Sequence, residues 1–137
     1  MKFLFVGEKP SAKAKALGAS WHTRQLAGKT LAAALDQAGI EERDRAFINL
    51  FGDDPEATVG DTTTVRSRVR TIRAKARDGF TVVALGRKVQ RVLTSHHVEH
   101  LRLTHPAARG SIRKSERYHA HVRETLKPDE QRPGKAA

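Results

Sequence analysis

Four short apolar runs, alternating with stretches of helical periodicity, constrain the fold of this chain more than any other feature. The clearest run is Phe-Thr-Val-Val-Ala-Leu at residues 80–85, flanked by Gly79 and Gly86, which is the pattern of a strand buried on both faces. We expect the other strands at residues 3–6, 45–51 and 98–103. We expect helices at residues 26–38, 62–77, 87–94 and 115–126, and an exposed loop at residues 11–20. The alternation predicts an α/β fold with a four-stranded parallel sheet.

Three polar residues stand at the ends of expected strands. Glu8 follows the first strand, Asn49 lies near the end of the second, and His105 follows the fourth. Right-handed crossovers place the carboxyl ends of all parallel strands at one edge of the sheet, and ligands bind outside that edge. We therefore expect these three side chains to converge in one cleft.

Length and composition bound the class of protein. A chain of 137 residues is long enough for one domain with its own core, which we place at residues 1–127, and residues 128–137 have the composition of a flexible tail. The absence of cysteine excludes disulfides and cysteine-ligated metal or iron–sulfur sites. No apolar run has the length of a signal peptide or a membrane span, so we expect a cytoplasmic protein, a monomer that contacts no membrane.

The net charge of +11 is unevenly distributed. Residues 1–65 contain 8 Lys and Arg against 9 Asp and Glu, whereas residues 66–137 contain 18 against 6, which gives −1 and +12. Such an excess favours a polyanion through counterion release, and nucleic acid is the usual one. Part of this charge lies on one face of the helix expected at residues 62–77, which carries Arg66, Arg70, Arg73 and Arg77. Such a face is most often simply solvated.

The motifs at the strand ends carry a resemblance to a known family. The chain reads Gly7-Glu8-Lys9-Pro10-Ser11 after the first strand, Phe47-Ile48-Asn49-Leu50 at the second, Val82-Val83-Ala84-Leu85-Gly86-Arg87 at the third, and His105-Pro106-Ala107 after the fourth. In order and spacing these segments resemble the uracil-DNA glycosylase superfamily, especially its small bacterial and phage-type members. The resemblance extends over residues 2–126 and implies a three-layer sandwich around the parallel sheet.

The family mechanism gives three of these residues a role. The resemblance implies a DNA repair hydrolase that flips a uracil or modified pyrimidine out of DNA and hydrolyses its N-glycosidic bond, without a cofactor or metal. His105 would donate a hydrogen bond to a carbonyl of the departing base, Glu8 would position the water, and Asn49 would read the base edge. From the residues alone, a turn-capping role for Asn49 and an ion pair of Glu8 with Lys9 or Lys13 remain open.

Contacts to DNA follow from the same resemblance. Arg109 stands where the family places the residue that enters the base stack, and the single- or double-stranded DNA backbone would contact Lys9, Ser11, Ser111, Arg113 and Lys114. Trp21 and Phe51 are the two candidates for a ring that stacks on the flipped base, although a Phe after a buried strand also suits the core.

Two positions depart from the family pattern and keep other functions open. Ala107 replaces a serine whose hydroxyl would contact phosphate, and Lys9 replaces a small or acidic side chain or an asparagine. The alternatives are a DNA-binding or partner-binding module without catalysis, and an enzyme acting on free nucleotides or hypermodified bases through the same cleft.

Two further patterns are not expected to form sites. His96, His97 and His100 lie close in sequence, but neighbouring residues of a strand point to opposite faces, so we expect no metal site there. Gly28-Lys29-Thr30 lacks the upstream glycine and the preceding strand of a phosphate-binding loop.

Overall fold

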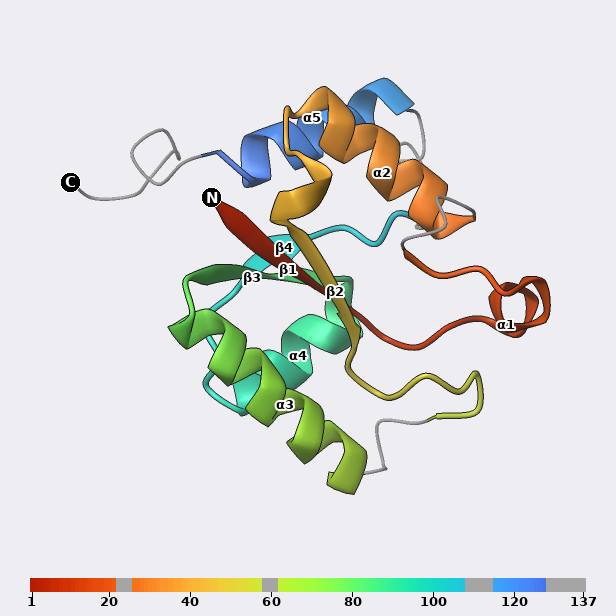
Figure 1. Ribbon diagram of the computed structural model, residues 1–137, viewed down its shortest axis with the longest axis vertical. Coiled ribbons are helices and arrows are strands. Elements are labelled where there is room, and N and C mark those ends of the chain that lie inside the picture. The colour runs from red at the N-terminus through yellow and green to blue at the C-terminus, as the bar shows by residue number, and fades with distance from the viewer. Residues whose placement is uncertain (22–25, 58–61, 108–114, 128–137) are drawn as a thin grey trace.

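A four-stranded, all-parallel sheet forms the centre of the protein, as the computed structural model shows (Figure 1). The structure describes residues 1–21, 26–57, 62–107 and 115–127. The strand order is β2-β1-β3-β4. The strands are β1 (Lys2–Gly7), β2 (Arg45–Asn49), β3 (Phe80–Leu85) and β4 (Leu101–Leu103). The predicted α/β architecture with a parallel sheet is confirmed.

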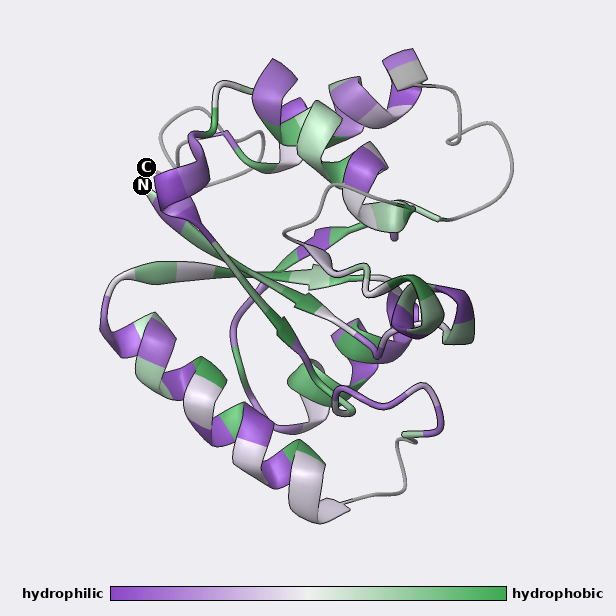
Figure 2. Cartoon of the chain, turned by 45° about the vertical axis from the view of Figure 1, so that its right-hand side comes forward, coloured by the Kyte–Doolittle hydropathy of each residue, from purple (hydrophilic) through white to green (hydrophobic). Residues whose placement is uncertain are grey.

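Helices cover both faces of this sheet, which gives three layers (Figures 1 and 2). The helices are α1 (Ala12–Leu17), α2 (Ala27–Gln37), α3 (Thr62–Arg77), α4 (Arg87–Ser95) and α5 (Ser115–Thr125), with a 3-10 turn η2 (Glu42–Asp44) before β2. Leu4 and Val6 of β1 pack with α3 and α4 on one face, whereas Phe3 and Phe5 pack with α2 and α5 on the other. Since successive strand residues alternate between faces, the apolar run of β1 supplies both cores.

Helix α1 occupies the segment that we expected to be an exposed loop, and that expectation was wrong. The Ser11 side chain caps the helix by accepting a hydrogen bond from the Ala14 N–H at 3.0 Å, and Gly18 ends it in the left-handed conformation. The helix buries none of its residues, so no apolar periodicity marks it in the sequence. Its alanines and lysines are instead strong helix formers between two good caps.

Strand β4 is shorter than expected and does not include residues 98–100. The Val98 N–H donates to the Leu93 carbonyl at the end of α4 (2.9 Å), so it is not available for a strand ladder. The Val98 side chain is nevertheless buried in the core. The remaining predicted strands and helices are confirmed, with ends that differ by one or two residues.

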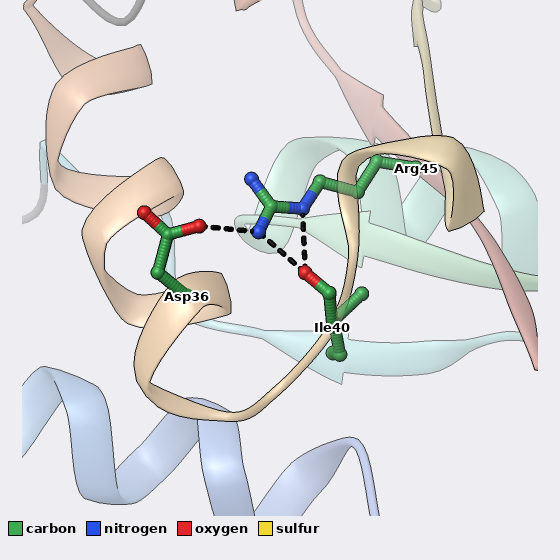
Figure 3. Close-up of polar contacts among 3 residues, drawn as sticks. All are labelled: Asp36, Ile40 and Arg45. Atoms are coloured by element: carbon green, nitrogen blue, oxygen red, sulfur yellow. Dashed lines mark hydrogen bonds and ion pairs between the residues drawn. The ribbon is translucent and has the colours of Figure 1, made fainter.

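Arg45 fixes the turn that leads from α2 into β2 (Figure 3). Its side chain is only 5% exposed; Nε donates to the Ile40 carbonyl at 3.0 Å, and Nη2 donates both to that carbonyl and to Asp36 Oδ1 at 2.6 Å. One planar guanidinium therefore joins the last turn of α2 to the first residue of β2.

Replacing Arg45 tests whether its side chain stabilises the turn between α2 and β2. We expect Arg45→Ala to lower the free energy of unfolding by about 2 kcal/mol, because the Ile40 carbonyl loses its donors and the buried stem is lost. Asp36, whose side chain is 49% exposed, provides the matched control. Asp36→Asn removes the charge from its half-exposed ion pair with Arg45 and is expected to lower the free energy of unfolding by less than about 1 kcal/mol. Denaturant unfolding of both variants measures these free energies, and equal losses would contradict a specific role of Arg45 in the turn.

Candidate functional site

The carboxyl ends of the strands bring the predicted site residues to one edge of the sheet. Gly7 at the end of β1 is the register partner of Asn49 at the end of β2. The pairing continues beyond β2, because the Leu50 N–H donates to the Gly7 carbonyl at 2.8 Å and the Phe51 N–H to the Glu8 carbonyl at 2.9 Å. His105 follows β4 at the same edge.

Two hollows at this edge share His105. The first, about 500 Å³ in volume, is lined by Asn49 and Trp21 together with residues of α1 and the start of α2; we call it the Trp21 hollow. The second, about 630 Å³, is lined by Glu8, Gln90 and His121 among others; we call it the Glu8 hollow. The structure therefore brings Asn49 and His105 together in one hollow, and places Glu8 in the neighbouring one.

His105 is held as a neutral imidazole with its proton on Nε2. The Ala107 N–H lies 3.0 Å from His105 Nδ1, and since a backbone N–H only donates, Nδ1 is the acceptor. Burial lowers the pKa of His105 below its ordinary value, and the nearby Glu8 carboxylate opposes this shift only in part. The remaining Nε2–H is a hydrogen-bond donor fixed in direction by the main chain.

Asn49 and Trp21 meet over the end of β1. The Trp21 indole N–H donates to Asn49 Oδ1 at 3.1 Å, and the Trp21 ring lies 6.1 Å from the Phe47 ring and 6.0 Å from the His105 ring, edge-on to the latter. A Cβ atom added to Gly7 would stand 2.9 Å from the Trp21 ring and 3.0 Å from Asn49 Oδ1. The first glycine of the opening motif is therefore needed for the close approach of these two side chains.

Helix α5 bonds both main-chain polar groups of Thr104, the residue before His105. The Tyr118 hydroxyl donates to the Thr104 carbonyl at 2.8 Å, and the Thr104 N–H donates to His121 Nε2 at 2.9 Å. Burial lowers the pKa of His121 and raises that of Tyr118, so both side chains stay uncharged in these roles. The backbone that delivers His105 is thus anchored to a helix.

The other predicted site residues are placed differently. Phe51 does not line the Trp21 hollow. Its side chain is only 3% exposed and belongs to the core on the α3 and α4 face, because the apolar run continues past the end of β2 into that core. Lys9 and Ser11 line that hollow, although the Ser11 oxygen also caps α1. Glu8 faces Lys88 Nζ at 4.0 Å. Arg109, Ser111, Arg113 and Lys114 lie outside the described residues.

Sequence reasoning missed the support of His105. The motifs singled out in the sequence include neither Tyr118 nor His121, which lie on the last expected helix. The signal was their spacing of three residues, which places a hydroxyl and an imidazole on neighbouring positions of one helix face. Among the described residues, no three His, Cys, Asp or Glu side chains gather as a metal site would require.

The chain matches the sequence model of a known protein family. Residues 1–127 match the sequence model of the uracil DNA glycosylase superfamily. No curated protein matches the chain. In the part of the chain that the structure describes, no helix combines the length and apolar character of a membrane span.

The contact between Thr104 and His121 predicts a pH dependence of stability. The unfolded chain binds a proton on His121 near its ordinary pKa of about 6.5 and the folded chain only at lower pH, so stability falls as the pH falls through this window. We expect His121→Gln to lose less stability than the wild type between about pH 7.5 and about pH 5, and to lie within about 1 kcal/mol of it at the higher pH. Denaturant unfolding at both pH values measures this, and an unchanged pH dependence would contradict it.

Proposed function

We propose, from the premise that this chain belongs to the uracil DNA glycosylase superfamily, that it hydrolyses the N-glycosidic bond of uracil or a modified pyrimidine flipped out of DNA. The observation that carries the proposal is the hydrogen bond that the Ala107 N–H donates to His105 Nδ1. It leaves an oriented N–H donor at the border of a hollow that Asn49 also lines.

The leaving group supplies the electrostatic requirement. When the bond between base and deoxyribose breaks, its electron pair stays with the pyrimidine, and the negative charge spreads onto a ring carbonyl. A hydrogen-bond donor aimed at that oxygen stabilises the charge as it develops. The neutral His105 is suited to this role, because its Nε2–H donates without transferring a proton.

Glu8 is suited to the sugar side of the reaction. As the base departs, positive character develops at the sugar carbon, and a water must attack there. Glu8 lines the hollow that shares His105, and its side chain is 30% exposed, so it remains accessible to water. In the proposed step its carboxylate accepts a proton from the water whose oxygen bonds to the sugar carbon.

Asn49 is suited to reading the base, and Trp21 sets the direction in which it reads. An indole N–H can only donate, so the amide oxygen of Asn49 must face Trp21. The amide N–H groups are then left for a ligand in the Trp21 hollow, and the second lone pair of Oδ1 remains as an acceptor. A donor next to an acceptor complements the carbonyl and ring N–H of uracil.

A DNA reader without catalysis is the second candidate, because Ala107 offers no hydroxyl to a phosphate and Lys9 lines the Trp21 hollow. The long ammonium side chain of Lys9 is suited to binding a phosphate, whether or not a reaction follows. The experiment below distinguishes the two candidates.

The first test is a cleavage assay on single- and double-stranded oligonucleotides that carry uracil or other modified pyrimidines. After alkali treatment, we expect strand breaks with the wild type and about 10²–10³-fold slower cleavage with His105→Ala, since one donor to the leaving group is removed. Asn49→Ala is expected to slow cleavage as well. Salt-sensitive binding without any breaks would support the DNA reader and contradict the glycosylase.

The second test removes the donor that orients Asn49. We expect Trp21→Phe, which keeps a ring but loses the N–H, to slow uracil excision about tenfold and to weaken the preference for uracil over cytosine, because the amide is free to turn. Phe47→Leu, which changes the packing around Trp21 but keeps the hydrogen bond, is the control. An unchanged base preference in Trp21→Phe would show that another contact orients the amide.

A further inference from the structure

The outward face of α3 carries a row of arginines that take no part in packing the helix against the sheet. Val65, Val69 and Ile72 point into the core. Arg66, Arg70, Arg73 and Arg77, which we call the arginine face, are all exposed and follow one another at intervals of four, three and four residues. Such spacing places them on one side of a helix. The helix contains six Arg and Lys and no Asp or Glu.

Among the residues that the structure describes, these cations have few acidic partners. Within α3, Arg68 forms an ion pair with Asp53 at 3.0 Å, and Arg73 donates to the His96 carbonyl. No ion pair joins Arg66, Arg70 or Arg77 to any residue of the described ranges. Like charges three or four residues apart on a helix repel each other, so the row weakens α3 unless a polyanion lies against it.

The position of α3 relates this row to the candidate site. As the crossover from β2 to the parallel strand β3, the helix runs opposite to the strands (Figure 1). Its first turn therefore lies towards the sheet edge that carries His105, and its last turn lies towards the far edge. From Arg66 to Arg77 the row extends about 16 Å along the helix axis, at about 1.5 Å per residue.

Duplex DNA matches this row in charge and shape. A duplex carries about one phosphate charge per 1.7 Å of axis, so a straight stretch of about 16 Å offers enough phosphates for four guanidinium groups. Guanidinium groups also bind phosphate oxygens in pairs. An anionic membrane fits less well, because the apolar side of α3 is already buried against the sheet and nothing apolar remains to enter the lipid.

We propose that the arginine face of α3 binds the phosphate backbone of duplex DNA outside the two hollows of the candidate site. The contact requires no particular base, because phosphates carry no sequence information. It is independent of whether the protein excises a base, and it holds the flanking duplex while the sheet edge meets one nucleotide.

The test compares two double variants with the same loss of charge. Arg70→Gln/Arg77→Gln removes two members of the row that form no ion pair with a described residue. The control, Arg43→Gln/Arg123→Gln, removes two exposed arginines that lie before β2 and on α5. Binding to a uracil-free duplex of about 30 base pairs is measured between about 50 and about 150 mM salt.

We expect the α3 variant to reduce the slope of log affinity against log salt by about 1.8, or about 0.9 per lost phosphate contact. The wild type then loses about sevenfold more affinity than the variant over this salt range. The control is expected to keep the wild-type slope. An unchanged slope in the α3 variant, or equal reductions in both, would overturn the proposal, since the second result means attraction by net charge alone.

Two further arms exclude other polyanions. If the α3 variant bound duplex DNA normally but lost binding to duplex RNA, or to vesicles containing anionic phospholipid, the proposal would be overturned in favour of that partner. Because no arm requires strand cleavage, the result stands apart from the glycosylase test. The protein can bind duplex DNA through the arginine face without excising a base, or excise a base without using the arginine face, and the two experiments distinguish these outcomes.

Discussion

The parallel pairing of β1 between β2 and β3 is the constraint on which the other features of the molecule depend. Every residue of β1 from Phe3 to Gly7 is buried, and its partners on both sides run in the same direction. Parallel strands need long crossover connections, and these became the helices of the two outer layers. The same direction brings the carboxyl ends of all four strands to one edge, where Asn49 lies beside Gly7 and His105 follows β4.

The site edge is precise because its main chain is held from several directions. Tyr118 of α5 donates to the Thr104 carbonyl, His121 of α5 accepts from the Thr104 N–H, and the Gly86 N–H donates to the Leu103 carbonyl at 2.9 Å. A Cβ atom on Gly86 would lie 3.4 Å from the Cβ of His105, so the turn after β3 also packs closely against the histidine. Functional side chains placed on such braced backbone keep their geometry better than those on free loops.

The sequence predicted most of the fold because each buried strand and amphipathic helix leaves a local periodic pattern. It failed for α1, which buries none of its residues, and at Val98, whose N–H is taken by the end of α4. The positions of Asn49 and His105 at one edge of the sheet were predictable from their places at strand ends. Phe51 followed a strand as well, but the chain turned its ring into the core.

Contacts between distant segments were not predictable. Trp21 and Asn49 are 28 residues apart, and His121 and Thr104 are 17 residues apart. Nothing in the local pattern of either partner indicates such a bond, since both depend on how α2 and α5 pack against the sheet. In the sequence, Arg45 is simply the polar first residue of a strand. Its burial and its contact with Asp36 depend on the packing of α2, so they were likewise not predictable.

The hydrogen bond from Ala107 to His105 has a consequence for how this segment tolerates evolutionary drift. The group that sets the tautomer of the histidine is a main-chain N–H, which nineteen of the twenty amino acids possess. The codon for residue 107 is therefore free to change without disturbing the imidazole, provided that it does not become one for proline. A serine at this position and the alanine found here are equivalent in this respect, so the histidine keeps the same tautomer while the neighbouring hydroxyl is gained or lost.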